Sequence, residues 1–282
     1  MEHLDKRLNA FRPDLADVRL KGRVSADRFV AGVPARTGDN VASIHKEPRA
    51  NSTQINQALP GELLSVFEDK DGWSWVQMAA DSYVGYVRSQ MLAAEIAPVT
   101  HVVAVASTHA YPEPNIKSQP ALWFPMLSEL AVIGEEDKFL KLAGGRFVLR
   151  DHLRPVATHE TDPAAVAERF LHVPYYWGGK TQSGLDCSGL IQISMRACGL
   201  LAPRDSDMQE QGLGRALPER GINELRRNDL VFWKGHVGIM ADEDMLLHAN
   251  GHHMMTVKEP LAAARERIAK SYGEITVIRR LQ

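Results

Sequence analysis

Residues 47–139 contain two stretches that match each other at a constant offset, and this repeat limits how the first half of the chain can fold. Matching residues lie 66 positions apart (113 minus 47), and both copies consist of short apolar runs broken by Gly, Asp, Asn and Pro. Such runs, separated by turn residues, are typical of antiparallel strands in a small barrel. The matched pairs are Glu47-Pro48 with Glu113-Pro114, Leu64 with Leu130, Val66 with Val132, and Trp73 with Phe139.

The first copy contains the clearest pair of strands, LLSVFEDKDGWSWVQM at residues 63–78. Its DKDG segment separates two apolar runs and predicts a hairpin turn. With Gly-Trp opening one strand and YVGYV closing the unit, this copy resembles the bacterial SH3-like domain. The second copy matches more loosely, and one larger β domain is the alternative. We predict an N-terminal extension, residues 1–30, and two barrels, residues 31–96 and 97–157.

Helical signals replace the strand-like runs from Asp162 onward. Asp162 can cap a helix, and Pro163 suits the first turn because its missing N–H would have no intrahelical partner there. Apolar pairs four residues apart continue this helix toward Pro174. A second helix is expected to begin at Cys187 and to end at Gly199.

Beyond Asn228 the chain returns to short apolar runs, namely DLVFW, HVGIM, MLLHA and TVK. Lys-Gly, Asp-Glu-Asp and Asn-Gly separate these runs, which therefore predict antiparallel strands joined by turns. Helices packed on such a sheet form an α+β domain, for which we predict residues 158–282.

The balance of charge and the apolar pattern exclude several partners. The chain has 33 basic and 35 acidic residues and a net charge of -2, so no overall field attracts nucleic acid or an anionic membrane. The sequence has no uninterrupted run of about 18 apolar residues, so it does not predict a membrane-spanning helix. The N-terminal segment lacks the apolar stretch of a secretory signal. Two cysteines are too few for a disulfide framework. We predict a cytoplasmic protein, whose oligomeric state the sequence does not indicate.

Cys187 is the candidate nucleophile because it lies at a predicted helix start, directly after the Gly-rich and aromatic segment PYYWGGKTQSGLD. The N-terminus of a helix stabilises a thiolate, so the pKa of this thiol is predicted to fall. A cysteine is often buried simply as a small apolar residue, which is our interpretation of Cys198. Cys187 differs because the polar residues Asp186 and Ser188 flank it.

The base for this thiol must come from elsewhere in the chain. His236 opens the run HVGIM after a Lys-Gly turn, and His248 follows 12 positions later (248 minus 236) in MLLHA. Neighbouring antiparallel strands can place two such side chains on one face, where the second fixes the tautomer of the first. We predict His236 as the base and His248 as its orienting partner, and we interpret His252 and His253 as loop residues.

Four blocks in order, PYYWGG with DCSGL, PRDSDMQ, RNDLVFWKGHVGIM and LLHAN, resemble the NlpC-type (NlpC/p60) cysteine peptidases. The resemblance covers residues 161–282 and implies a papain-like domain that cleaves peptidoglycan stem peptides without a metal or an organic cofactor. It also implies that the third catalytic position, which is His, Asn or Gln in the family, is His248 here. The predicted fold class is therefore α+β, with a papain-like NlpC-type domain preceded by two small SH3-like β-barrels.

Two SH3-like units before such a domain resemble the γ-D-glutamyl-L-diamino-acid endopeptidases of the dipeptidyl-peptidase VI type. These enzymes act on murein peptides that have a free N-terminal L-alanine. The resemblance implies that Tyr175 helps to polarise the scissile carbonyl and that Asp205 and Ser206 approach the substrate ammonium. It implies further substrate contacts at Asp186, Ser188 and Trp177.

In the same group the first SH3-like domain supplies a glutamate and a tyrosine to the substrate. Glu47 and Tyr83 are the candidates for these two positions. The alternative for Glu47 is a solvated turn residue before Pro48, and the alternative for Tyr83 is a residue that packs its own barrel.

The resemblance implies hydrolysis of the bond between γ-D-glutamate and the diamino acid. The lack of a recognisable secretory signal predicts a role in the recycling of cell-wall peptides inside the cell, with export without a leader as the alternative. Cys187 attacks the carbonyl, His236 protonates the leaving amine, and water releases the acyl-enzyme. Two alternatives are a peptidoglycan-binding protein with an inactive peptidase domain and an acyltransferase on the same fold. The sequence does not indicate which diamino acid is preferred.

Overall fold

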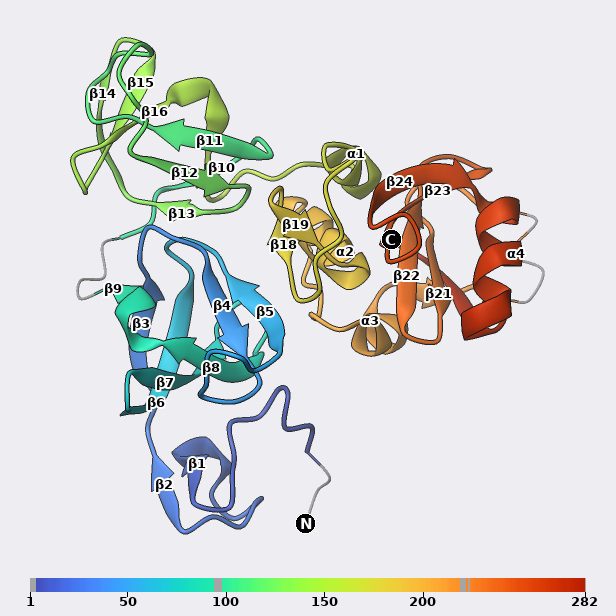
Figure 1. Cartoon of the computed structure of the whole chain (residues 1–282), viewed down its shortest axis with the longest axis horizontal. Coiled ribbons are helices and arrows are strands. Elements are labelled where there is room, and N and C mark those ends of the chain that lie inside the picture. Colours follow the sequence, from blue (N-terminus) through green and yellow to red (C-terminus); the bar gives the residue numbers. More distant parts are fainter. Residues whose placement is uncertain (1–3, 94–97, 219–221, 223, 282) are drawn as a thin grey trace. The chain divides into compact units, whose positions relative to one another are not determined.

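The computed structural model describes residues 4–93, 98–218, 222 and 224–281. The chain folds into two compact units, residues 1–156 and 157–282 (Figure 1). The second unit thus begins one residue before the boundary expected from the sequence. The expected boundary between the barrels, at residues 96 and 97, lies outside the described residues.

The first barrel is a seven-stranded antiparallel sheet in the order β5-β4-β8-β7-β6-β3-β9. Asp71 and Gly72 join β6 to β7 with φ of 54° and 76°, so the predicted hairpin turn is confirmed. Ile44, Leu64 and Val76 are fully buried in its core. The strands are β3 (Val33–Thr37), β4 (Ala42–His45), β5 (Gln54–Ala58), β6 (Leu63–Lys70), β7 (Trp73–Met78), β8 (Val84–Arg88) and β9 (Leu92–Ala93), with the 3-10 helix η2 (Ser89–Met91) before β9.

The second half of the first unit repeats this pattern of strand pairing around a core of its own. In the first barrel β3 pairs with β6 and β9, and in the second β10 pairs with β13 and β17. The expected fold, with two small barrels before an α+β domain, is confirmed. The elements are β10 (His101–Val103), β11 (Ser107–Ala110), β12 (Leu122–Pro125), β13 (Glu129–Leu130), β14 (Val132–Glu136), β15 (Phe139–Leu142), β16 (Phe147–Leu149), η3 (Arg150–His152) and β17 (Leu153–Pro155).

The N-terminal extension packs against the first barrel. Leu15 is buried in one cluster with Phe67 and Trp75 of the barrel. The Arg12 guanidinium lies over the Trp75 ring, 4.4 Å from its centroid, and donates to Glu68. The extension is therefore part of the same unit, and its elements are β1 (Leu15–Asp17), η1 (Val18–Leu20) and β2 (Arg28–Val30).

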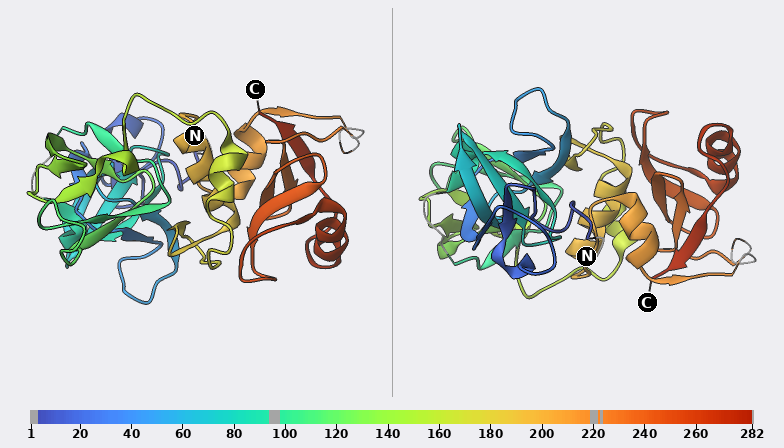
Figure 2. Two further views of the ribbon diagram at one scale, coloured as in Figure 1. Left: turned by 90° about the horizontal axis from the view of Figure 1, so that it is seen from above. Right: turned by 90° about the horizontal axis from the view of Figure 1, so that it is seen from below.

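The second unit is built on a six-stranded sheet in the order β20-β25-β21-β22-β23-β24. Helices α1 and α2 lie on one side of this sheet and α4 lies on the other (Figures 1 and 2). The strands predicted from the four apolar runs are confirmed as β21 to β24. The elements are α1 (Pro163–Glu168), β18 (Lys180–Thr181), β19 (Gly184–Leu185), α2 (Cys187–Ala197), α3 (Ser206–Gly212), β20 (Arg215–Ala216), β21 (Leu230–Trp233), β22 (His236–Met240), β23 (Met245–Asn250), β24 (Met255–Pro260), α4 (Leu261–Tyr272) and β25 (Val277–Arg280).

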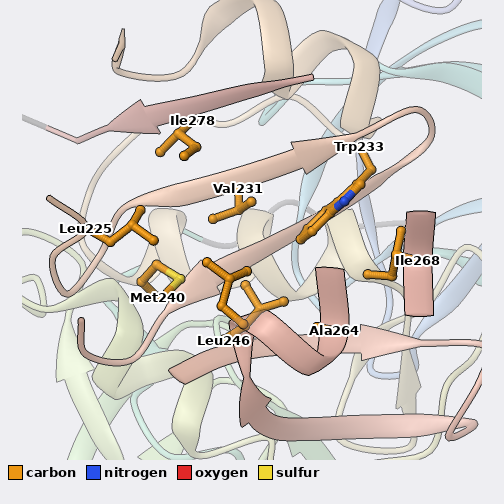
Figure 3. Close-up of a cluster of buried hydrophobic side chains, with 9 residues drawn as sticks. Leu225, Val231, Trp233, Met240, Leu246, Ala264, Ile268 and Ile278 are labelled. Atoms are coloured by element: carbon orange, nitrogen blue, oxygen red, sulfur yellow. The ribbon is translucent and has the colours of Figure 1, made fainter. Parts of the chain in front are cut away.

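A buried cluster joins α4 to its face of the sheet (Figure 3). Val231 and Trp233 are two residues apart on β21, so both side chains point to the same face of the sheet. Ala264 and Ile268 of α4 pack against them there. Trp233 is fully buried. The cluster holds α4 in place, and α4 supplies one of the charged groups described below.

The first predicted helix is shorter than expected. Helix α1 ends at Glu168, and the next N–H groups, of Arg169 and Phe170, donate to carbonyls three residues back. His172 has a φ of 66°, and its N–H donates to Thr256 of β24. The chain therefore leaves the helical conformation to pair with β24 before the apolar pattern of this segment ends.

Candidate active site

Cys187 is the first residue of α2, as predicted. Asp186 caps the helix, because its Oδ1 accepts the Gly189 N–H at 2.7 Å. Cys187 itself is 7% exposed. The backbone N–H groups of Ser188 and Val237 donate to its sulfur, and Val237 directly follows His236. The thiol thus lies where the start of α2 meets the start of β22.

A buried ion pair beside the thiol was not predicted from the sequence. Arg204 is 1% exposed and donates to both carboxylate oxygens of Asp186, at 2.9 and 2.7 Å. It also donates to Ser188 Oγ at 3.0 Å. One guanidinium therefore ties together the two residues that flank Cys187. Asp186 is a cap and an ion-pair partner here, and its expected role in substrate contact stays a prediction.

The segment that follows Arg204 is hydrogen-bonded to the start of α2. Gln209 of α3 donates to the Ser188 and Pro203 carbonyls, at 2.9 and 2.8 Å. Asp205 and Ser206 form the N-terminal end of α3, and both are half-buried. They are neighbours in sequence of the residue that binds Asp186. Their predicted contact with a substrate ammonium is compatible with this placement.

The two predicted histidines are joined. His236 Nε2 lies 2.8 Å from His248 Nδ1, and the ring centroids are 5.1 Å apart. β22 and β23 are adjacent antiparallel strands, as expected. A Cβ on Gly238 would lie 2.7 Å from Leu246 Cδ1 and 3.1 Å from the His248 Cβ. Glycine at this position therefore leaves the space in which the His248 side chain lies.

His248 has a second partner that sequence reasoning missed. Its Nε2 lies 2.8 Å from Glu259 Oε1 on β24, and Arg267 of α4 donates to both Glu259 oxygens. Despite a rise from burial, the hydrogen bonds from His248 and Arg267 lower the pKa of Glu259 to about 2. An acidic residue in TVKEP, on the strand after MLLHA, was the available sequence signal.

The predicted lowering of the thiol pKa is wrong for this structure. Burial, reinforced by the negative charge of Asp186, raises the pKa of Cys187 to about 12, although the N–H groups of Val237 and Ser188 act in the opposite direction. Burial also lowers the pKa of His236 to about 3. Desolvation outweighs the helix terminus, so both groups are neutral before substrate binds. The thiol proton must therefore move during attack.

Acid is expected to destabilise the second unit through these histidines. Burial lowers the pKa of His236 to about 3 and lowers that of His248 against the opposing charge of Glu259. Unfolded histidine titrates near 6.5. Below that pH the unfolded chain binds protons that the folded chain excludes. The free energy of unfolding should therefore fall by up to about 1.4 kcal/mol per pH unit for each histidine, and the contribution should be constant above about pH 7.

Urea unfolding at pH 7.5 and 5.5, read from hydrogen exchange of peptides over residues 230–250, checks this expectation. A His236→Gln variant should lose part of the pH dependence because one titrating group is gone. Equal unfolding free energies at the two pH values would contradict the prediction.

The aromatic segment before Cys187 has one half-buried ring and two exposed ones. Burial, together with the negative charge of Asp186 and the charge that Cys187 would carry once ionised, raises the pKa of Tyr175 well above its usual range, so its hydroxyl keeps its proton. Tyr176 and Trp177 are 47% and 63% exposed. Tyr175 can donate a hydrogen bond near the thiol, and the substrate contact predicted for Trp177 stays a prediction.

The two residues predicted in the first barrel have local partners. Glu47 is exposed, and Arg49 donates to its carboxylate at 2.6 Å, as expected for a solvated turn residue. Tyr83 is 4% exposed and belongs to the core of its own barrel. These surroundings favour the alternatives stated for both residues. Their contact with a substrate stays a prediction.

The remaining candidates have no place in the chemistry described above. Cys198 is the C-cap residue of α2, at the opposite end from Cys187, and both cysteines are reduced thiols. Within the described ranges, no group of three His, Cys, Asp or Glu side chains could hold a metal ion. No helix in the described part of the chain is long and apolar enough to span a membrane.

Nucleophilic acyl transfer needs a thiol that can be stabilised as an anion and a base that accepts its proton. Cys187, with two N–H donors to its sulfur, and the linked imidazoles of His236 and His248 supply these groups. The fold and these groups define the second unit as a cysteine peptidase domain. Comparison with known proteins agrees: residues 172–271 match the NlpC/P60 family, and residues 44–92 match the bacterial dipeptidyl-peptidase Sh3 domain. Residues 172–271 are therefore an NlpC/P60 domain, and residues 44–92 are an Sh3 domain of the bacterial dipeptidyl-peptidase kind.

Curated relatives have modest identity to this chain. Dipeptidyl-peptidase 6 of Lysinibacillus sphaericus is 25% identical over 74% of this chain and 85% of its own length. Gamma-D-glutamyl-L-lysine dipeptidyl-peptidase of Bacillus subtilis (strain 168) is 30% identical, over 44% of this chain and 45% of its own length.

A solved structure has the same fold. An NlpC/P60 family protein from Bacillus cereus ATCC 10987 aligns with a TM-score of 0.74 at 18% identity, covering 88% of this chain and 99% of that one. The likeness supports the fold alone, because the identity is low.

Proposed function

We propose that this protein hydrolyses the bond between γ-D-glutamate and the diamino acid of short murein peptides with a free N-terminal L-alanine. The observation that carries the proposal is the joined set at Cys187: the Val237 and Ser188 N–H groups on its sulfur and the linked rings of His236 and His248. The names of the two relatives, dipeptidyl-peptidase 6 and gamma-D-glutamyl-L-lysine dipeptidyl-peptidase, support this substrate class.

The mechanism begins with transfer of the thiol proton to His236 as Cys187 attacks the carbonyl of D-glutamate. The N–H groups near the sulfur and the protonated Tyr175 hydroxyl are the candidate donors to the oxyanion. His236 then returns the proton to the leaving amine of the diamino acid, which forms an acyl-enzyme. Water, deprotonated by His236, releases the L-Ala-γ-D-Glu dipeptide and regenerates the thiol.

Recognition of the free amino terminus is proposed for Asp205, with Ser206 as a further hydrogen-bond partner. A carboxylate offsets the desolvation of a bound ammonium, which a neutral acetylated terminus does not need. The half-buried position of both side chains beside the Arg204 anchor supports this assignment.

A pair of substrates tests the proposal. The tripeptide L-Ala-γ-D-Glu-diamino acid should be cleaved to dipeptide and free diamino acid, whereas its N-acetylated form should react at least about tenfold more slowly, since one lost charge pair costs more than about 1.4 kcal/mol. Mass analysis of both reactions measures the products. Equal cleavage would contradict recognition of the amine, and no cleavage of either peptide would contradict the proposed activity.

We further propose that the protein works in the cytoplasm, in the recycling of cell-wall peptides. The chain has only two cysteines, too few for a disulfide framework, and this agrees with a reducing compartment. Fractionation of cells that express the tagged chain tests the location.

A further inference from the structure

A charged pair, Glu259 with Arg267, contacts His248 through the ring nitrogen that His236 does not use. His248 Nε2 lies 2.8 Å from Glu259 Oε1, and Arg267 donates to Glu259 Oε2 at 2.7 Å and to Oε1 at 2.5 Å. β24 supplies the carboxylate and α4 supplies the guanidinium. His248 is fully buried, so its Nε2 has no access to water in place of these partners.

The carboxylate decides which nitrogen of His248 carries the proton. The hydrogen bonds from His248 and Arg267 outweigh burial and lower the pKa of Glu259 to about 2, so at neutral pH it is ionised and can only accept. Nε2 of His248 must therefore be protonated. Asn250 Nδ2 lies 3.1 Å from the same nitrogen, but a carboxylate is the stronger partner than a neutral amide donor.

The tautomer of His248 determines the tautomer of His236. With the proton on Nε2, Nδ1 of His248 has a lone pair and accepts from His236 Nε2 at 2.8 Å. His236 is then protonated at Nε2 and has its own lone pair on Nδ1. Only that tautomer can take a proton with Nδ1 while it stays bonded to His248.

We propose that Glu259, held by Arg267, is a positioning residue that fixes His248 as the Nε2–H tautomer and thereby makes Nδ1 of His236 the base. The proposal rests on the proposed role of His236 in peptide hydrolysis. Glu259 also stabilises positive charge that develops on the two rings, and Arg267 limits that effect.

Among the described residues, the charged and titratable groups that act on the two rings come from β24, α4 and the turn after β23. Glu259 and Arg267 act on both rings, the negative charge raising and the positive charge lowering the pKa of His236. His253 lies in the turn after β23, with its Nδ1 4.0 Å from Glu259 Oε1, and lowers the pKa of His248. On the α2 side, Cys187 faces the start of β22, where the Val237 N–H donates to its sulfur, and Asp186 is the charged neighbour of that thiol.

The tautomers are measured first, in a way that needs no substrate. Nitrogen-15 NMR of the ring nitrogens at pH 7.5 should show Nε2–H on both His236 and His248, with signals assigned by their loss in single His→Gln variants. A proton on Nδ1 of His248 would overturn the proposal, whatever the activity of the enzyme.

Two variants with opposite charge effects provide the kinetic test. Glu259→Gln should lower kcat/KM by about 10- to 100-fold, mostly in kcat, and move the acid limb of its pH profile to lower pH. Arg267→Met should move that limb to higher pH, because it removes the positive charge that opposes protonation of His236. Glu274→Gln and Arg265→Met are the matched controls, since they break an exposed pair that also involves α4. Neither control should change the profile.

Alkylation of Cys187 by iodoacetamide, in a Cys198→Ser background, also depends on His236, because this ring must accept the thiol proton as the sulfur attacks. The acid limb of the alkylation rate should therefore shift in the same way in each variant. This arm separates failure of the positioning role from failure of the proposed function, because it needs no peptide. Opposite shifts of the two variants support the proposal even if one variant is less stable. Shifts in the same direction, or profiles like those of the controls, would overturn it.

Discussion

Replacing Cys187 with alanine is expected to lower kcat/KM for the tripeptide by at least about 10,000-fold, because loss of the nucleophile removes the covalent route entirely. The fold should persist, since alanine fills most of the same buried volume at the start of α2. Mass analysis of the products and circular dichroism check the two statements. Cys198→Ala is the matched control, because Cys198 lies at the other end of the helix, and it should keep wild-type activity.

Residual hydrolysis within about tenfold of the wild-type rate would show that the thiol is not the nucleophile. The same experiment separates the alternative functions. A wild-type protein that binds the peptide without cleaving it would be a binding module. Transfer of the acyl group to an added amine, detected as a new product, would indicate an acyltransferase.

Replacing Arg204 with methionine is expected to destabilise the second unit by about 3–5 kcal/mol, because Asp186 then keeps a buried charge that has lost its ionic partner. Two N–H donors to Asp186 remain, from Gly178 and Gly189, but neither carries a charge. Urea unfolding, followed by hydrogen exchange of peptides from α2, measures the loss. Arg265→Met, which breaks an exposed pair, should cost less than about 1 kcal/mol.

The double variant Arg204→Met with Asp186→Asn keeps this prediction testable if the single variant does not fold. It removes both charges, so it should be more stable than Arg204→Met alone. A double variant that is less stable than the single one, or a single variant as stable as wild type, would contradict the prediction.

Local features of this protein could be predicted from neighbouring residues. Asp186 caps α2, Cys187 begins it, and Gly199 follows its end with a φ of 73°. Asp71-Gly72 forms the hairpin turn, and His236 and His248 lie on adjacent strands. Each of these depends on backbone preferences, a cap or a hairpin register within a short stretch of chain, so the necessary information lies in that stretch.

Distant partners and burial could not be predicted in the same way. Arg204 binds Asp186 from 18 residues away, and Arg267 reaches Glu259 only because α4 packs on the sheet. The apolar pattern after Glu168 predicts more helix than forms, because pairing with a distant strand competes with it. The pKa of Cys187 moves opposite to the prediction, since desolvation depends on everything packed around the sulfur. Caps, turns and neighbouring strands can therefore be predicted from the sequence. Charge states and contacts between distant segments depend on which parts of the chain are buried together in the folded protein.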